Sequence, residues 1–370
     1  MRVTCDRKAL LAAMGAVSGV VPSRSPKPIL THVLLTADAD GATLSATDLE
    51  IGICHVVLGV KVDDQGSAVL PAAKFTSILS ASNDAEMWIE TQDDAILVQG
   101  KHAKYRLPSE DPNLFPQVPA FDAGEFYSIE AAALRLAIRR TQYATDAEST
   151  RYALSGTLCD VNGGVLTMVG TDGRRLAMQP VDVVPVNGCV APDPLPVVPL
   201  KALRLLDRIL SDSVDIVRLA FEAGRSVRVQ TDQATIYSRL VEGRFPRYGD
   251  VVPPTWKSTV TITAGSLNGA VAQASILTSD ESRGVDFAFA DDVLTLSASN
   301  AIGSAQIQVP IEFSDEPVSV SLDPRFVAEA LKPMDPATEL TLRVSDSKTA
   351  VVVLADDGFQ YVVMPLSRDR

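Results

Sequence analysis

The chain has 370 residues, of which 46% are hydrophobic, 21% charged and 5% aromatic, and its formal net charge is −13. A chain of this length is expected to form two or three domains, and its composition excludes a disordered polypeptide. The acidic excess argues against an ordinary nucleic-acid-binding protein, which would carry a surplus of cations.

The N-terminal segment is predicted to form a short strand followed by an amphipathic helix. Leu10, Met14 and Val17 fall on one helical face. Cations before the apolar run at residues 9–21 also resemble a secretory signal peptide. Asp6 among those cations, glycines within the run and the absence of a small-residue cleavage site disfavour a signal peptide.

This strand-helix opening returns twice, at residues 128–141 and 261–274. Other segments recur with the same period of roughly 125 residues. They include the positions of Asp48, Asp172 and Asn300, and the pairs Phe115-Pro116, Phe245-Pro246 and Met364-Pro365. A period of this size indicates one domain-sized unit repeated three times. We therefore predict three similar domains, at residues 1–124, 125–255 and 256–370.

Each third is predicted to contain two helices and several strands. Second helices are expected after Pro71, Pro199 and Asp323-Pro324, because proline suits the first turn of a helix. Apolar and polar residues alternate, as in half-buried strands. The clearest alternations lie at residues 33–36, 87–90, 226–230, 318–322 and 351–354. The predicted fold class is α+β, with two helices packed on antiparallel sheets in each domain.

Residues that could carry catalysis or bind a metal are sparse. The three histidines are far apart, and none has a cysteine or carboxylate at metal-ligand spacing. Phosphate-binding loops and a nucleophile elbow are missing from the sequence. Asp172 could serve a hydrolase, but Asp-Gly after a strand typically forms a turn, and the repeated Asx residue favours that interpretation. We predict a non-catalytic protein with no cofactor and no metal.

The four cysteines are too sparse for a disulfide scaffold and show no C-x-x-C spacing. They are predicted to be small core residues in a reducing compartment. Apolar runs stay shorter than the ~18 residues that a membrane span requires.

Cations are concentrated in the middle third, on one face of each of its two predicted helices. They are Arg135, Arg139 and Arg140 on the first helix, and Lys201, Arg204 and Arg208 on the second. Leucine and isoleucine occupy the opposite faces, so both helices are amphipathic. A solvated helix face is the alternative for either helix alone. Two such faces in one domain of an acidic chain favour a surface that faces a polyanion such as duplex DNA.

A second group of residues is small or aliphatic and lies at predicted strand ends. Its members are Leu154, Thr171, Gly173, Leu176, Pro246, Val251, Val362, Met364, Pro365 and Leu366. Core or terminal positions are one interpretation of this group. A tail that contains methionine and proline could instead line a groove for a partner's peptide, because methionine adapts its shape to varied ligands.

Several segments together resemble one known family. They are Lys27-Pro28-Ile29-Leu30, Thr47-Asp48-Leu49-Glu50, Gly170-Thr171-Asp172-Gly173, Val241-Glu242-Gly243-Arg244-Phe245-Pro246, Arg283-Gly284-Val285 and Tyr361-Val362-Val363-Met364-Pro365. In this order, on a threefold repeat, they make the chain similar over its whole length to the bacterial DNA polymerase III beta subunit, the replicative sliding-clamp family.

The resemblance implies a head-to-tail homodimeric ring of six domains, with pseudo-sixfold symmetry, around duplex DNA. It implies a cytoplasmic, nucleoid-associated processivity factor that is not itself an enzyme. Its partners would be the replicative polymerase alpha subunit, the clamp loader, and other polymerases and repair proteins, docked in a hydrophobic cleft between the central and C-terminal domains. An alternative is a clamp-like paralogue that acts as a non-replicative, DNA-associated interaction scaffold.

The resemblance also assigns site residues. It implies DNA contacts for Arg24, Tyr152 and Lys201, to which the helix faces add Arg135, Arg139, Arg140, Arg204 and Arg208. It implies that the small and aliphatic group forms the client-peptide cleft, with Arg174 and Arg175 beside it. The dimer interface would join Lys104, Tyr105 and Leu107 to Ile276 and Leu277.

The chain departs from the family pattern at several positions. Asp250 replaces a basic residue beside the cleft, which predicts altered client preference. An acidic run in the third domain is replaced by residues 301–306, so the dimer interface is expected to depend more on Ile276 and Leu277. Residues 367–370 extend past the usual end.

Overall fold

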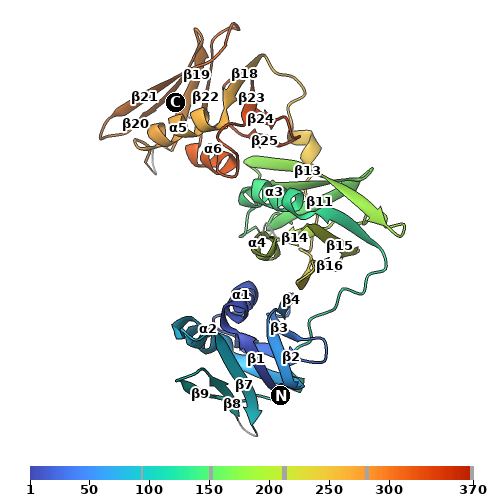
Figure 1. Ribbon diagram of the computed structural model, residues 1–370. Coiled ribbons are helices and arrows are strands. Elements are labelled where there is room, and N and C mark those ends of the chain that lie inside the picture. The colour runs from blue at the N-terminus through green and yellow to red at the C-terminus, as the bar shows by residue number, and fades with distance from the viewer. Residues whose placement is uncertain (93–94, 150–152, 211–214, 280–282, 367–370) are drawn as a thin grey trace. The chain divides into compact units, whose positions relative to one another are not determined.

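The computed structural model describes residues 1–92, 95–149, 153–210, 215–279 and 283–366 (Figure 1). Tyr152 and the tail at 367–370 lie outside the described residues. The strands pair antiparallel in every register that the described residues show, as the predicted fold class requires. We find no helix in the described ranges that is long and apolar enough to cross a membrane.

Two α-helices lie in each third of the chain, which confirms the prediction. They are α1 (Arg7–Val17), α2 (Ala72–Ala81), α3 (Ala131–Thr141), α4 (Leu200–Ile209), α5 (Ala264–Ser275) and α6 (Pro324–Leu331). Short 3-10 turns are η1 (Pro28–Thr31), η2 (Pro112–Leu114), η3 (Gln142–Ala144) and η4 (Tyr248–Val251). Pro324 occupies the first turn of α6 as predicted, whereas Pro71 is the N-cap of α2 and Pro199 precedes α4.

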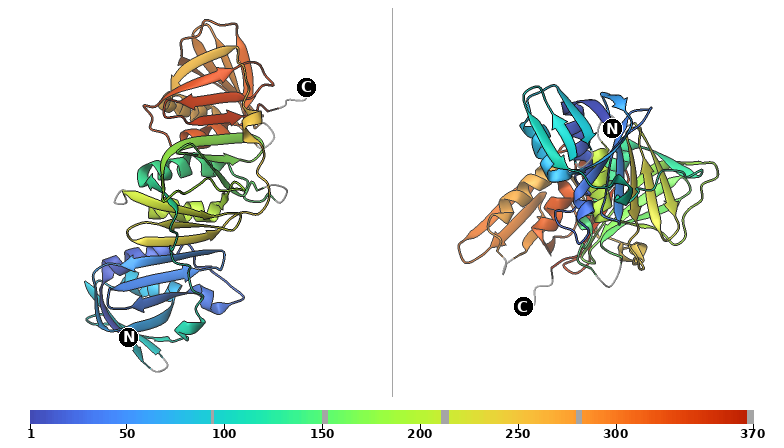
Figure 2. Two further views of the ribbon diagram at one scale, coloured as in Figure 1. Left: turned by 90° about the vertical axis from the view of Figure 1, so that its right-hand side faces the viewer. Right: turned by 90° about the horizontal axis from the view of Figure 1, so that it is seen from below.

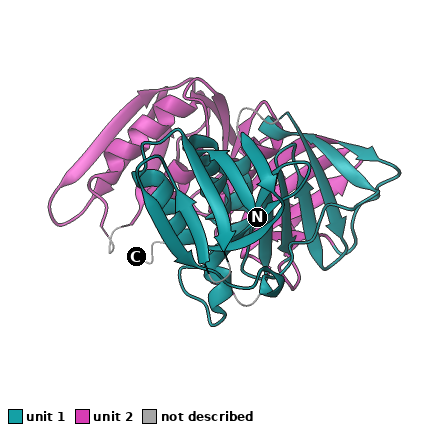
Figure 3. Cartoon of the chain, turned by 60° about the horizontal axis from the view of Figure 1, so that its bottom comes forward, with its two compact units in different colours: residues 1–132, 184–194, 201–240 teal, residues 133–183, 195–200, 241–370 magenta. Residues whose placement is uncertain are grey.

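The chain divides into two compact units (Figure 3). Unit 1 comprises residues 1–132, 184–194 and 201–240, and unit 2 comprises residues 133–183, 195–200 and 241–370. The middle third therefore contributes to both units. The predicted domain boundaries at 124/125 and 255/256 stay a prediction.

Unit 1 contains two runs of hydrogen-bonded strands. The first has the order β5-β1-β7-β8-β9, with β1 (Arg2–Asp6), β5 (Val60–Asp64), β7 (Glu86–Gln92), β8 (Ala95–Gln99) and β9 (Lys104–Pro108). The second has the order β10-β15-β16-β17-β4-β3-β2-β6. Its strands are β2 (His32–Ala37), β3 (Ala42–Thr47), β4 (Ile51–Val57), β6 (Gly66–Pro71), β10 (Phe126–Glu130), β15 (Ile216–Glu222), β16 (Ser226–Gln230) and β17 (Ala234–Arg239).

Unit 2 also contains two runs of strands. One has the order β18-β23-β24-β25-β13-β12-β11-β14, with β11 (Gly156–Asn162), β12 (Val165–Thr171), β13 (Arg175–Val186), β14 (Val197–Pro199), β18 (Ser258–Thr263), β23 (Glu339–Val344), β24 (Val351–Ala355) and β25 (Gln360–Val363). The other has the order β22-β19-β20-β21, with β19 (Val285–Ala290), β20 (Val293–Ser299), β21 (Ser304–Pro310) and β22 (Val318–Leu322). Helices α5 and α6 lie together on one side of the strands of the C-terminal third (Figures 1 and 2).

Consecutive thirds of the chain are joined by strand pairs. In unit 1, β17 of the middle third pairs with β4 of the first third. In unit 2, β25 of the last third pairs with β13 of the middle third. The sheets therefore continue from one third into the next within each unit.

The N-terminal helix is a core element of unit 1. Asp6 caps α1 by accepting the Ala9 backbone N–H at 2.8 Å, and Leu10, Met14 and Val17 are fully buried. These three positions confirm the predicted apolar face. They place the apolar side of the helix against strands β3 and β4 and against α2.

The cysteine prediction holds for two of the four residues. Cys5 and Cys159 are buried, and burial raises the pKa of each thiol to about 12. The prediction of core positions is wrong for Cys54 and Cys189, which are only partly buried.

Candidate functional site

The repeated Asx residue forms the same turn in all three thirds. Asp48 Oδ1 accepts the backbone N–H groups of Glu50 and Ile51 at 2.9 and 2.7 Å. The equivalent bonds of Asp172 go to residues 174 and 175, and those of Asn300 to residues 302 and 303. The turn interpretation is confirmed. Each turn leads into a strand, namely β4, β13 or β21.

The backbone explains why a small or locally bonded residue follows the Asx position. Gly173 has a φ of 83° and Leu49 has a φ of 79°, both in the left-handed region that disfavours residues with a Cβ. The hydroxyl groups of Thr171 and Thr47 accept the N–H groups of these two residues at 3.1 and 3.0 Å. These bonds hold the turn at the rim of the sheet.

The cationic face of α4 forms as predicted. Leu203, Leu206 and Leu210 are buried, while Lys201, Arg204 and Arg208 are exposed. Arg24, which lies between α1 and η1, is also exposed in unit 1. The periodicity of the helix separates the two kinds of residue onto opposite faces. DNA contact by these cations stays a prediction.

Two of these cations contact other groups of unit 1. Lys201 Nζ donates to Asp48 Oδ2 in an ion pair. Burial acts to raise the pKa of Asp48, but the hydrogen bonds from Lys201, Ile51 and Glu50 outweigh it and hold that pKa below its usual value. Arg208 lies over Gly19 and approaches the Gly15 carbonyl, near the C-terminal end of α1, where a helix favours cations.

The cations of α3 differ from one another in burial. Arg139 is exposed and Arg135 is half-buried. Arg140 is only 4% exposed, donates to Gln179 Oε1 at 2.9 Å, pairs with Asp357 and lies over the Phe359 ring. The prediction that Arg140 faces DNA is therefore wrong. A helix turns by about 100° per residue, so Arg140 points to the packed face, where Asp357 supplies its partner.

The ion pair between Lys201 and Asp48 gives a testable prediction. We expect Asp48→Asn to keep the turn, because Asn300 makes the same two backbone bonds in the third repeat. The change removes the carboxylate that neutralises Lys201. The affinity for duplex DNA should rise about threefold at low salt, and the slope of log affinity against log salt should steepen by about 1. Fluorescence anisotropy over a salt series measures both, and an unchanged slope would contradict the role of Lys201.

One pocket in unit 2 gathers most of the small and aliphatic group. Its lining is Leu154, Thr171, Gly173, Arg174, Arg175, Leu176, Pro246, Arg247, Tyr248, Val251, Val362 and Met364. We call it the apolar pocket. Its open volume of about 500 Å³ lies in the usual range of ligand-binding sites. The predicted members Pro365 and Leu366 do not line it.

Strand register brings these residues together from distant parts of the chain. Leu176 on β13 lies opposite Val362 on β25, and the Met364 N–H donates to the Arg174 carbonyl at 2.9 Å. Residues 246–251 close the pocket through the short turn η4. The C-terminal strand therefore joins the pocket by pairing with the strand that follows the Asp172 turn.

Sequence reasoning missed two lining residues, Arg247 and Tyr248. Both lie between the predicted members Pro246 and Val251, and this proximity is the signal that could have found them. The Tyr248 hydroxyl donates to Asp160 Oδ2 at 2.6 Å. Burial, together with that bond, raises the pKa of Tyr248 to about 12.

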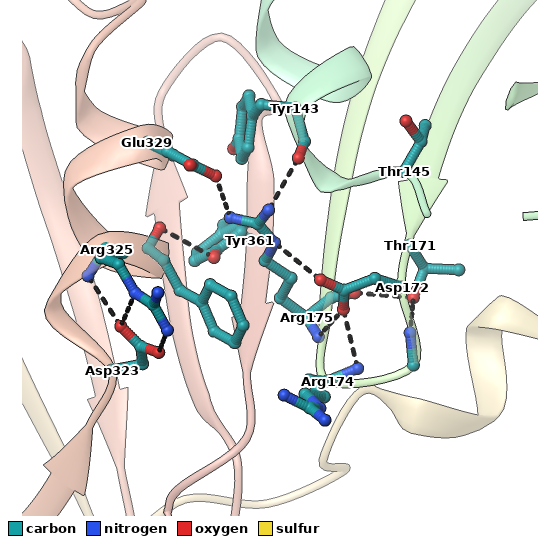
Figure 4. Close-up of polar contacts among 12 residues, drawn as sticks. Tyr143, Thr145, Thr171, Asp172, Arg174, Arg175, Asp323, Arg325, Glu329 and Tyr361 are labelled. Carbon is teal, nitrogen blue, oxygen red and sulfur yellow. Dashed lines mark hydrogen bonds and ion pairs between the residues drawn. The ribbon is translucent and has the colours of Figure 1, made fainter. Parts of the chain in front are cut away.

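Arg175 belongs to the structure beneath the pocket (Figure 4). Its guanidinium donates to Asp172 Oδ2 at 3.0 Å, to Glu329 Oε2 at 2.5 Å and to the Tyr143 carbonyl at 2.7 Å, and it lies over the Phe326 ring. Burial acts to lower the pKa of Arg175, but nearby acidic groups outweigh it and raise that pKa. Arg175 ties β13 to α6 and has its charge neutralised.

The rim of the apolar pocket is cationic. Three arginines and no carboxylate stand among its lining residues. Arg175 is ion-paired, whereas Arg174 and Arg247 are exposed. Asp250 is exposed and does not line the pocket. In a chain with a net charge of −13, this local sign favours an occupant that carries negative charge.

The predicted interface residues lie on exposed parts of the two units. Lys104, Tyr105 and Leu107 belong to β9, the last strand of its sheet in unit 1. Ile276 follows α5 in unit 2 and is 76% exposed. Leu277 lies next to the Asn300 turn, where a Cβ on Gly303 would be 3.8 Å from it. Their role in a dimer stays a prediction.

Metal-binding chemistry has no candidate among the residues that the structure describes, which hold no group of three or more histidine, cysteine, aspartate or glutamate side chains suited to an ion. Asp172, the one carboxylate that could have served a hydrolase, is bonded to its own turn and to Arg175. These contacts give it a structural role.

Family models cover almost the whole chain in three consecutive matches. Residues 1–119 match the N-terminal domain of the DNA polymerase III beta subunit, residues 128–247 match its central domain, and residues 250–367 match its C-terminal domain. The three matches follow the threefold repeat of the sequence.

Full-length relatives agree with the domain matches. Beta sliding clamps from Synechococcus elongatus and Pseudomonas aeruginosa are each 29% identical to this chain, over 99% of it and 99% and 100% of their own lengths. The crystal structure of the Pseudomonas aeruginosa DNA polymerase III subunit beta is 28% identical, with a TM-score of 0.90 over 100% of both chains. A structure of that organism's clamp bound to griselimycin is 29% identical, with a TM-score of 0.91 over 100% of both chains. The chain therefore belongs to the DNA polymerase III beta subunit family, the beta sliding clamps.

Proposed function

We propose that this chain pairs head to tail with a second copy to form a ring around duplex DNA, and that the ring holds the replicative polymerase at its template. Membership of the beta sliding clamp family carries the proposal. The family acts as a non-catalytic processivity subunit, and the full-length likeness favours this role over a non-replicative scaffold.

The cations of the described residues support contact with DNA. Arg24, Lys201, Arg204 and Arg208 are exposed in unit 1, and Arg139 is exposed in unit 2. Contacts of this kind attract the phosphate backbone without regard to sequence. A closed ring stays on DNA by topology, so weak contacts suffice and an acidic protein can perform the task.

The apolar pocket supports a role in docking client proteins. It combines an apolar floor that includes Val362 and Leu176 with a rim that includes Met364, Arg174 and Arg247. A short peptide with apolar anchors and an acidic residue would fit this chemistry. The proposed clients are the polymerase alpha subunit, the clamp loader, and other polymerases and repair proteins, in the cytoplasm at the nucleoid.

Retention on DNA of different topology tests the proposal. We expect the protein, loaded with a bacterial clamp loader and ATP onto a nicked circular plasmid, to remain on the circle through gel filtration. Linearising the loaded plasmid with a restriction enzyme should release most of the protein, because a ring slides off a free end. Equal retention on circular and linear DNA would overturn the ring proposal, since it would show binding to the DNA surface alone.

A further inference from the structure

Two sheets end in strands that have a neighbour on one side only, within the residues that the structure describes. β9 ends the first sheet of unit 1, and β21 ends the sheet β22-β19-β20-β21 of unit 2. Free edges are usually protected by charged side chains. β21 has none, since its sequence is Ser-Ala-Gln-Ile-Gln-Val-Pro. Ile302, just before it, is 89% exposed. An uncharged edge with an exposed isoleucine beside it indicates an interface.

The threefold repeat identifies the partner of this edge. β4, β13 and β21 are equivalent, because each follows an Asx turn. β17, β25 and β9 are also equivalent, because each is the second strand of a hairpin, formed with β16, β24 and β8 respectively. Two of the three possible pairs exist in the chain, namely β4 with β17 and β13 with β25. The remaining pair is β21 with the β9 strand of a second copy.

The two existing pairs share one register. The residue three positions after the Asx residue lies opposite Ser238 in the first pair and Val363 in the second. Ser238 and Val363 each lie three positions after the first paired residue of their hairpin strand, Thr235 or Gln360. The corresponding first residue of β9 is Lys104.

We infer that β21 pairs antiparallel with β9 of a second copy, with Gly303 opposite Leu107, Ala305 opposite Tyr105 and Gln306 opposite Lys104, and that no ion pair crosses this strand pair. The inference rests on the proposed head-to-tail dimer and specifies its register and chemistry. We call this strand pair the seam.

Side-chain sizes match across the inner face of the seam. Ala305 is partly buried beside α5, and Gly303 has no side chain. These small residues leave room for Tyr105 and Leu107 of the second copy. Their side chains would then reach the end of α5, where Ile276 and Leu277 are available as apolar contacts. Large residues on one strand therefore meet small residues on the other.

The outer face of the seam carries cations on one side only. Ser304 and Gln306 are exposed on β21 and would face Arg106 and Lys104 of the second copy. A hydroxyl and an amide can accept hydrogen bonds from these cations but supply no opposite charge. Backbone hydrogen bonds and apolar contacts would hold the seam, so its affinity should depend little on salt.

A cysteine pair tests the register. Lys104→Cys with Gln306→Cys should form disulfide-linked dimers under mild oxidation, because directly opposite residues lie within disulfide reach. Lys104→Cys with Ser304→Cys is the matched control, since a diagonal pair lies at about 7–8 Å, beyond that reach. The parent chain, with its four native cysteines, is the blank on a non-reducing gel. Preferential linking of the control pair would overturn the register.

A salt series tests the chemistry. Light scattering over a dilution series should show a parent dimer whose dissociation constant changes less than about threefold between low and high salt. Gln306→Glu should tighten the dimer about threefold at low salt, and added salt or Lys104→Gln should remove that gain. A parent dimer that weakens tenfold or more with salt would overturn the uncharged seam.

The outcomes separate the inference from the function on which it rests. A chain that stays monomeric at every concentration would refute the head-to-tail ring itself. A stable dimer in which neither cysteine pair links, or in which Gln306→Glu has no effect, would refute the seam and leave the ring intact.

Discussion

Replacing Arg175 by methionine should strongly destabilise unit 2. The substitution keeps an apolar side chain against Phe326 but removes the donor to Asp172, Glu329 and the Tyr143 carbonyl. Two carboxylates then lose their buried partner. Breaking a buried pair costs about 3–5 kcal/mol, and we expect about 2–4 kcal/mol because Glu329 is half exposed. Denaturant unfolding followed by circular dichroism measures the loss.

The adjacent residue provides the control for this experiment. Arg174 carries the same side chain one position earlier, but it is exposed and contributes only its backbone carbonyl to the Met364 N–H. Arg174→Met should change the unfolding free energy by less than about 0.5 kcal/mol. Equal losses for the two variants would mean that the ion pairs of Arg175 do not stabilise the fold.

The second large effect concerns client binding. Truncating Met364 and Val251 together to alanine should weaken the binding of a peptide with apolar anchors and an acidic residue by about 30–150-fold, because each truncation at an interface centre costs about 1–1.5 kcal/mol. Both side chains line the apolar pocket and are about half exposed, so the fold should tolerate their loss. Fluorescence anisotropy with a labelled peptide from a polymerase alpha subunit measures the affinity.

Pro365→Ala distinguishes the pocket from the tail as a whole. Pro365 follows Met364 directly but does not line the pocket. The peptide affinity of this variant should match that of the parent chain. A loss as large as that of the double variant would place the binding site along the tail instead, and light scattering on all variants checks that the oligomeric state is unchanged.

Local patterns predicted the elements well because they depend on residues that are close in sequence. The apolar periodicity of Leu10, Met14 and Val17 specified α1, and the alternation at residues 226–230 coincides with β16. The Asx turns were also predictable. Their hydrogen bonds join residues two and three positions apart, so the sequence contains both partners.

Side-chain environments were less predictable. Arg140 has the same composition and helical context as Arg139, and only the position of Asp357, more than two hundred residues later, makes it a buried ion-pair partner. Arg175 was expected beside the cleft with a free charge like that of Arg174. Its neutralisation depends on Glu329 and Tyr143, which no local pattern connects to it.

The sequence by itself determined the threefold repeat, the α+β class, the cationic face of α4 and most of the residues of the apolar pocket, because each rests on periodicity, on short-range bonding or on family motifs. Tertiary structure decided which of these residues meet. The register of β13 with β25 brings Leu176 to Val362, and the packing of α3 turns Arg140 away from solvent. Contacts between residues far apart in the chain follow from strand pairing and packing, and neither is written in a local pattern.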